Sequence, residues 1–198
     1  MKWYKYNIRD LISADYRKWY AFMSREKQAR VDRLRFEDDK KRTVAGEMLA
    51  RKAIAEWCNI SAEGIVFDRT ETGKPYVKDL PVEFNISHSG DMVVCAVDDK
   101  PVGIDVEKIR PIDLKLAKRI CTDEELVYLF DHIPTEQDFA YTTDQELLTR
   151  FFELWTANEA YGKCIGAGMS EIRKQVRASV QFNLWEEYII SIYKPPSC

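Results

Sequence analysis

The sequence predicts an α+β protein, because helical and strand-like patterns occupy separate blocks of the chain. Between Ser13 and Cys58 the apolar residues recur at helical spacing, and short β-like runs follow as far as Glu107. Turns such as "HSGD" and "DDKP" join these runs over hairpin lengths, without helical crossovers. This order favours small antiparallel sheets packed on helices over a parallel doubly wound sheet.

Each element follows from its local pattern. The three strands between residues 82 and 107 are predicted to form an antiparallel meander. "CTDEEL" indicates an N-cap with acidic residues in the first helical turn, and the strongest helical pattern stops before "GAG". In chain order the predicted elements are helices within 13–58, strands at 65–67, 82–87, 92–97 and 101–107, helices over 113–119, 122–130 and 144–163, and strands at 175–183 and 188–193.

The composition predicts a compact cytoplasmic protein. No apolar run approaches the ~20 residues of a membrane span, and the N-terminus has no apolar signal-peptide core. The five cysteines include no C-x-x-C pair, which argues against a disulfide framework or a structural zinc site. Only two histidines are present, so carboxylates would have to supply any metal ligands, and they favour Mg²⁺.

Charge is distributed unevenly along the chain, whose net charge is −3. Between Tyr16 and Lys52, twelve Lys or Arg residues accompany six Asp or Glu residues. Such a segment is either a solvated helical surface or a surface for phosphate or an acidic partner. The acidic balance of the whole chain gives little support for nucleic-acid binding.

The stretch "VGIDVEKIR" carries two carboxylates at the end of an apolar strand. Asp105 and Glu107 are two residues apart, so their side chains should lie on one face of the strand, within reach of one cation. The alternative is that they face water or a nearby lysine such as Lys108. Their position, directly after a glycine where the backbone leaves the core, favours the metal site.

A second group lies in "FFELWTANEAYGK". Trp155, Glu159 and Lys163 are spaced four residues apart and therefore share one helix face. A Glu/Lys pair of this kind is commonly an ordinary surface pair, but the apolar neighbours indicate the edge of the core. If this helix packs against the acidic strand, Glu159 adds a third carboxylate to Asp105 and Glu107.

Three weaker signals lie elsewhere. "TGKP" places Lys74 and Pro75 in a turn, and "NISHSG" places Ser87 and His88 at the end of a strand. Arg42 lies near the start of a helix. Taken singly, each of these is a turn, a hydrogen-bonded structural histidine or a solvated arginine.

Together, in this order, the blocks resemble a known family. "GKP", "FNISHSG", "GIDVE" and "W-x-x-x-E-A-x-x-K" are similar to the 4′-phosphopantetheinyl transferases of the Sfp type, over about residues 24–169. The resemblance implies two similar α+β halves, here 1–110 and 111–198, with the active site at their interface. The chain ends soon after Tyr193, which suggests abbreviated last strands and an altered carrier-docking surface.

The implied reaction transfers the phosphopantetheine arm of coenzyme A to a serine of an acyl or peptidyl carrier protein and releases 3′,5′-ADP. Mg²⁺ is the implied cofactor, and coenzyme A and the carrier protein are the implied partners, with no nucleic acid and no membrane. A monomer is expected, since one chain supplies both halves. Other readings are a Mg²⁺-dependent hydrolase of coenzyme A or a related pyrophosphate, and a non-catalytic coenzyme A-binding protein.

The resemblance also implies roles by position. Glu159 is the implied general base, although a metal-bound water or the released phosphate could serve instead, because a bound cation lowers the basicity of a carboxylate. Asn158 replaces a lysine of the family pattern, so restoring lysine is expected to tighten coenzyme A binding. The implied residues are Asp105, Glu107 and Glu159 for Mg²⁺, Asp105, Glu159 and Lys163 for catalysis, and Lys27, Arg30, Arg42, Lys74, Pro75, Ser87, His88 and Lys163 for coenzyme A.

Overall fold

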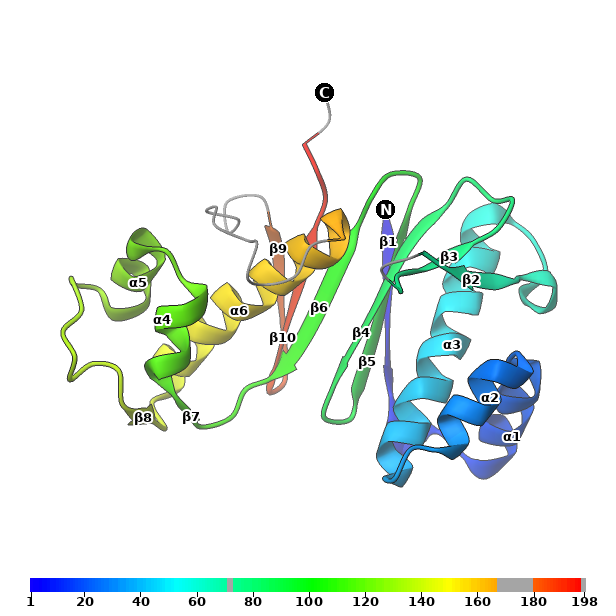
Figure 1. Ribbon diagram of the computed structural model, residues 1–198, viewed down its shortest axis with the longest axis horizontal. Helices are drawn as coiled ribbons and strands as arrows, with labels where there is room; N and C mark the ends of the chain where they lie inside the picture. The colour runs from blue at the N-terminus through cyan, green and yellow to red at the C-terminus, as the bar shows by residue number, and fades with distance from the viewer. Residues whose placement is uncertain (71–72, 167–179, 197–198) are drawn as a thin grey trace. The chain divides into compact units, whose positions relative to one another are not determined.

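The computed structural model describes residues 1–70, 73–166 and 180–196 of the chain (Figure 1). These residues divide into two compact units, Met1–Val102 and Gly103–Cys198, called unit 1 and unit 2 below. The division falls before the strand of Asp105 and Glu107, whereas the sequence placed it after that strand, at residue 110. The difference arises because this strand pairs and packs with elements of unit 2.

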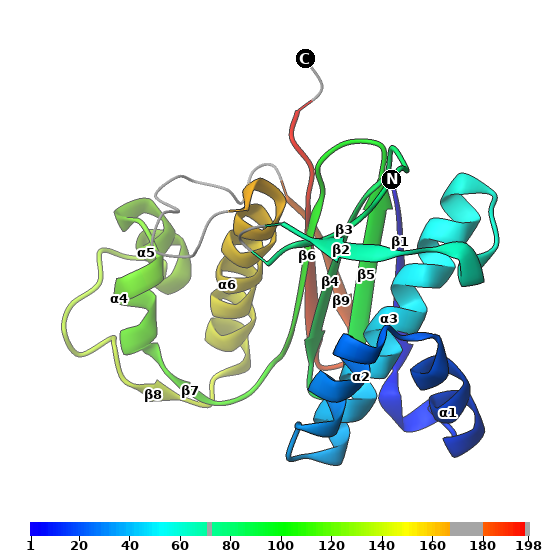
Figure 2. The same cartoon turned by 45° about the vertical axis from the view of Figure 1, so that its right-hand side comes forward.

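Unit 1 is a three-stranded antiparallel sheet, in the order β1-β5-β4, covered by α3 (Figure 1). The helical N-terminal quarter is confirmed, but as three helices, with α1 and α2 near the start of α3 (Figure 2). The elements are β1 (Lys2–Asn7), α1 (Ser13–Phe22), α2 (Arg25–Asp32), α3 (Glu37–Cys58), β2 (Phe67–Arg69), β3 (Pro75–Val77), β4 (Glu83–Ser89) and β5 (Met92–Asp98), with 3-10 turns η1 (Ile8–Asp10) and η2 (Ala62–Gly64).

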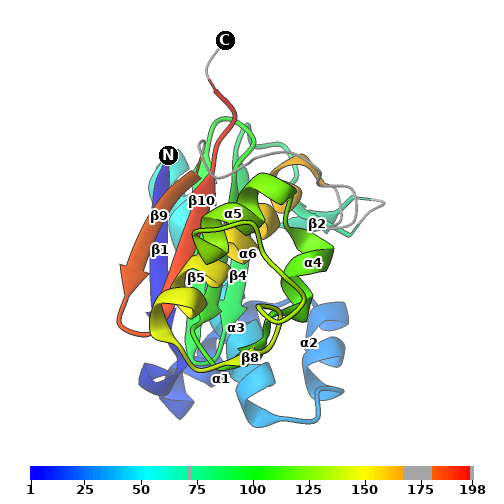
Figure 3. The ribbon, with the colours of Figure 1, turned by 90° about the vertical axis from the view of Figure 1, so that its left-hand side faces the viewer.

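Unit 2 is a second antiparallel sheet, in the order β6-β10-β9, with α6 packed on β6 and β10. The short helices α4 and α5 contact α6, as the view in Figure 3 shows. The elements are β6 (Gly103–Lys108), β7 (Ile112–Asp113), η3 (Leu114–Leu116), α4 (Ala117–Ile120), α5 (Asp123–Phe130), β8 (Tyr141–Thr142), α6 (Gln145–Ile165), β9 (Val180–Trp185) and β10 (Tyr188–Tyr193).

The α+β class with small antiparallel sheets is confirmed, but the predicted meander is wrong in its third strand. β4 and β5 form the expected hairpin, whereas β6 pairs with β10, more than 80 residues later in the chain. β1, which the sequence analysis did not predict, pairs with β5. Of the predicted strand at 175–183, the part before Val180 lies outside the described residues.

Local signals place several helix ends as expected. Thr122 caps α5 in a capping box, accepting from the backbone amide of Glu125 while the Glu125 carboxylate accepts from the Thr122 amide. Asp144 caps α6 by accepting from the amide of Leu147. None of the helices in the described part of the chain is long and apolar enough to cross a membrane.

Candidate active site

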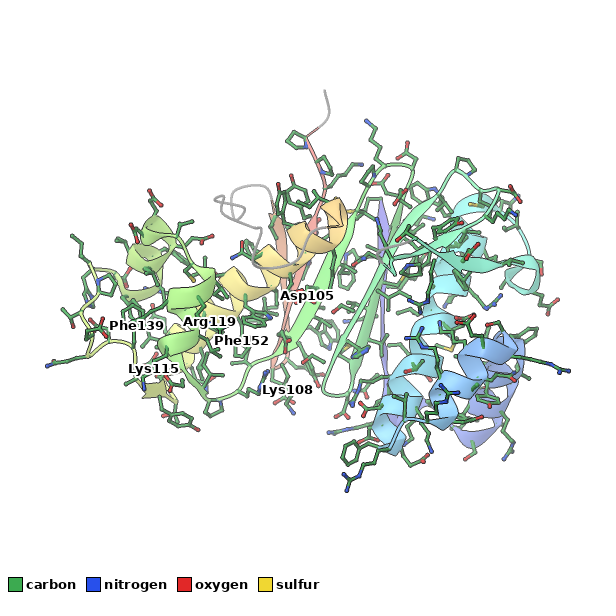
Figure 4. All side chains as sticks on the ribbon, viewed as in Figure 1. Asp105, Lys108, Lys115, Arg119, Phe139 and Phe152 are labelled. Carbon is green, nitrogen blue, oxygen red and sulfur yellow. The ribbon has the colours of Figure 1, made fainter. Side chains whose placement is uncertain are left out.

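The two carboxylates of the acidic strand lie on β6 of unit 2. Asp105 is buried, with 4% of its surface exposed, and lies beside α6 (Figure 4). Glu107 is partly exposed near the end of the strand. In the antiparallel ladder with β10, Asp105 pairs with Ser191 and Glu107 pairs with Ile189. Because the two acids are two residues apart on one strand, their side chains lie on the same face of the sheet.

Both carboxylates have a cationic partner in unit 2. Lys163, in the last turn of α6, donates from Nζ to Oδ1 of Asp105 at 2.6 Å. Arg110 donates from Nη1 to Oε2 of Glu107 at 3.1 Å. The first pair is largely buried, whereas the second is exposed enough to contribute little to stability. The packing of α6 on β6 therefore brings Lys163 to the acidic strand.

Glu159 completes a group of negative charges on α6 and β6. Burial raises the pKa of Glu159 above its ordinary value of 4.5, and the charge of Asp105 raises it further. Lys163 opposes this shift, and Glu107 adds to it. These interactions place Glu159 within electrostatic reach of the carboxylates of β6, as expected if the helix packs on the strand.

The arrangement of these carboxylates bears directly on metal binding. In the described ranges, no three His, Cys, Asp or Glu side chains lie together in a way that could hold a metal ion. Asp105 and Glu107 are instead neutralised by Lys163 and Arg110. Their carboxylate oxygens are of the donor type that a hard cation such as Mg²⁺ prefers. The predicted metal set therefore remains a proposal.

Asn158, which stands where the family pattern has a lysine, lies in the interior of unit 2. It is buried, with 2% of its surface exposed, and its amide nitrogen donates to the carbonyl of Ile120 at 3.3 Å. Ile120 is the last residue of α4, so the Asn158 side chain faces the interior of unit 2. A lysine here would have to bury its charge or move α4 away from α6.

We therefore expect Asn158→Lys to destabilise the protein by about 1–3 kcal/mol, because it places an unpaired charge in the interior. Coenzyme A binding should not tighten, contrary to the expectation from sequence. Urea unfolding and titration calorimetry with coenzyme A would measure the two effects. Unchanged unfolding together with tighter binding would mean that the new side chain reaches the ligand.

In unit 1, three of the predicted coenzyme A residues line one cavity of about 640 Å³, namely Lys27, Arg30 and Pro75. Phe67 and Phe84 form part of its apolar wall. Their rings lie 5.3 Å apart, centroid to centroid. The cavity thus combines cationic side chains with an aromatic wall of two tilted rings.

Arg42 lies at one end of β4. Its Nη1 donates to the carbonyl of Gly90 at 2.7 Å, in the turn that follows His88. Ser87 is buried and His88 is exposed in the same strand. The structure thus brings Arg42 to the strand end that carries the predicted Ser/His pair.

Lys74 lies toward the other end of β4. Its Nζ donates to Oε2 of Glu83, the first residue of that strand, at 3.2 Å. The length of β4 separates Glu83 from His88, about 17 Å at the usual rise of a strand. Lys74 therefore lies beside the first residue of β4, whereas Arg42, Ser87 and His88 lie at its other end.

Sequence reasoning missed several buried polar residues beside these sites. Glu47 and Arg51 form an ion pair next to Lys27, and their spacing in "GEMLAR" is the i, i+4 pattern that could have revealed them. In unit 2, Thr156 and Ser191 form a buried hydroxyl contact of 2.6 Å. No local sequence pattern indicates that second pair, because 35 residues separate its members.

Comparison with known proteins agrees with this two-unit architecture. Residues 11–100 match the family described as 4′-phosphopantetheinyl transferase, N-terminal, and residues 101–198 match the 4′-phosphopantetheinyl transferase superfamily. A 4′-phosphopantetheinyl transferase of Bacillus subtilis is 39% identical over 166 residues, which cover 83% of this chain and 70% of that protein. The chain belongs to the 4′-phosphopantetheinyl transferase superfamily.

Other relatives are more similar but are matched over less of their length. The 4′-phosphopantetheinyl transferase psf-1 of Bacillus pumilus is 45% identical over 75% of this chain and 60% of that protein. The 4′-phosphopantetheinyl transferase gsp of Aneurinibacillus migulanus is 41% identical over 74% of this chain and 57% of that protein. The chain thus spans somewhat more than half the length of these two relatives.

Proposed function

We propose that the protein transfers the 4′-phosphopantetheine arm of coenzyme A to a serine of an acyl or peptidyl carrier protein. The group of Asp105, Glu159 and Lys163, held by β6 and α6 in a chain of this superfamily, carries the proposal. The relatives of this chain, which are named 4′-phosphopantetheinyl transferases, support the same activity. A cytoplasmic location and a monomeric state are part of this proposal.

In the proposed reaction the serine oxygen forms a bond to the β-phosphorus of coenzyme A, and the anhydride bond to the α-phosphate breaks. The products are the phosphopantetheinyl serine and 3′,5′-ADP. Glu159 would accept the serine proton, directly or through a water molecule. Lys163 would exchange its contact with Asp105 for the pyrophosphate oxygens.

Mg²⁺ would be held by the carboxylates of Asp105, Glu107 and Glu159, and would supply neutralisation of the pyrophosphate charge. In unit 1, Arg42, Lys74 and His88 would bind the 3′-phosphate and adenosine end of coenzyme A, with Ser87 and Pro75 nearby. Lys27 and Arg30 would lie near the coenzyme A phosphates.

The proposal is tested by intact-mass spectrometry of apo carrier proteins incubated with the protein, coenzyme A and Mg²⁺. We expect the carrier to gain the mass of one phosphopantetheine, and EDTA should prevent the gain. Release of 3′,5′-ADP without a carrier protein would favour a hydrolase. Coenzyme A binding with no product on any carrier would favour a non-catalytic binding protein.

A further inference from the structure

A buried carboxylate at the wall of the unit 1 cavity forms ion pairs with two cationic side chains. Glu47 of α3 has only 2% of its surface exposed. Its Oε1 accepts from Nε of Arg51 at 2.9 Å and lies 2.8 Å from Nη2 of the same residue. Its other oxygen, Oε2, accepts from Nζ of Lys27 on α2. One carboxylate therefore joins α3 to α2 at the cavity wall.

Arg51 is itself held by backbone carbonyls from two other segments. Its Nη1 donates to Ile65 at 2.8 Å and to Ala62 at 3.0 Å, and its Nη2 donates to Phe22 at 3.3 Å. A guanidinium group remains charged and offers its donors in a fixed plane. These bonds fix Arg51, which in turn fixes the direction in which Glu47 points.

The charges of the network leave one positive charge at the cavity. Arg51 balances Glu47, so the ammonium of Lys27 is held by a carboxylate whose charge is already offset. Both cationic side chains lie over the ring of Phe67, with Nζ of Lys27 at 5.9 Å and Cζ of Arg51 at 5.1 Å from the ring centroid, within the range of cation–π contacts. The side chain of Lys27 lines the cavity and keeps 26% of its surface exposed, so a ligand in the cavity can contact it.

We propose that Glu47, fixed by Arg51, is a positioning residue that holds Lys27 at the cavity for a phosphate group of the ligand. This inference rests on the proposed function, in which that ligand is coenzyme A. A lysine side chain has several rotatable bonds, and ordering it in advance lowers the entropy lost on binding. Glu47 acts through Lys27 and touches no ligand atom.

Glu47→Gln separates positioning from simple charge. The substitution removes a negative charge next to the cavity, so attraction of a polyanion alone would tighten binding. Positioning predicts the opposite, a 3- to 10-fold weaker binding of coenzyme A by calorimetry, because Lys27 loses its anchor. Glu26→Gln is the matched control, since Glu26 lines the same cavity and is exposed, and this variant should bind coenzyme A at least as tightly as the wild type.

A double-mutant cycle with Lys27→Ala identifies the residue through which Glu47 acts. In that background Glu47→Gln should cause no further loss of coenzyme A binding, whereas a general structural role would weaken binding again. Glu47→Asp retains the charge that balances Arg51 but shortens the reach to Lys27, so it provides a second variant if Glu47→Gln unfolds. It should weaken binding only when Lys27 is present.

The outcomes distinguish this inference from the function on which it rests. Equal losses in both backgrounds, or tighter binding by Glu47→Gln, would overturn the positioning role while leaving coenzyme A as the ligand. Failure of the wild-type protein to bind coenzyme A would overturn both.

Discussion

Glu159→Gln should reduce transfer to a carrier protein by at least about 100-fold while making the metal-free protein slightly more stable. The loss follows from removal of the proposed proton acceptor, since general-base groups contribute about 10²–10⁴-fold to rate. The gain follows from the surroundings of Glu159, whose charge is disfavoured by burial and by Asp105 and Glu107. Catalytic groups held in unfavourable surroundings commonly oppose stability in this way.

The sign of the stability change can be checked against pH. The folded state raises the pKa of Glu159, so the folded protein binds this proton more tightly than the unfolded chain. The contribution to stability is present below the unfolded pKa of about 4.5 and is lost as pH rises through the raised folded value. Glu159→Gln does not titrate, so near neutral pH it should unfold at a temperature up to about 3 °C higher.

Carrier modification with Mg²⁺, followed by mass spectrometry, would measure the activity, and thermal unfolding of a separate aliquot in EDTA would measure the stability. Glu146→Gln is the control, because this substitution removes the same charge from the same helix. Glu146 lies at the exposed N-terminal end of α6, where it pairs with Arg150. Transfer by this control should stay within about twofold of the wild type. A fully active Glu159→Gln variant would exclude Glu159 as the base and favour a phosphate or water molecule.

The parts of the site that lie on one element could be predicted from the sequence. The period of a strand places Asp105 and Glu107 on one face, and the period of a helix places Glu159 and Lys163 one turn apart. The contact between Lys163 and Asp105 required only that the two elements pack, which the apolar neighbours of both indicated. Capping residues likewise predicted the start of α5.

The parts that depend on distant segments could not be predicted in the same way. β6 follows the β4–β5 hairpin closely, so local rules favoured a meander, but its partner β10 lies near the end of the chain. Asn158 was judged by its neighbour Glu159, although a step of one residue turns a helix by about 100° toward a different surface. Glu47 appeared to be one more charge in a basic segment until the fold buried it against Arg51.

Gly103→Ala should destabilise unit 2 by about 3 kcal/mol or more and abolish transfer, because β6 and α6 approach each other too closely at this glycine for any side chain. A Cβ atom at Gly103 would lie 1.8 Å from the carbonyl oxygen of Ala160 and 2.8 Å from the backbone nitrogen of Cys164. Both atoms belong to the helix backbone, which cannot rotate away as a side chain could. The strand must therefore move off the helix, and overpacking of this kind is strongly destabilising.

The displacement would also reach the chemistry, because Gly103 is two residues from Asp105, and the opposing atoms belong to Ala160 and Cys164, which directly follow Glu159 and Lys163 on α6. Urea unfolding would give the stability and carrier modification the activity, with Gly64→Ala as control, since a Cβ at Gly64 meets no atom within 4 Å. That control should change stability by less than about 1 kcal/mol. If Gly103→Ala proved as stable and active as the control, the close packing of β6 on α6 would not hold in solution, and the contact between Lys163 and Asp105 would lose its structural basis.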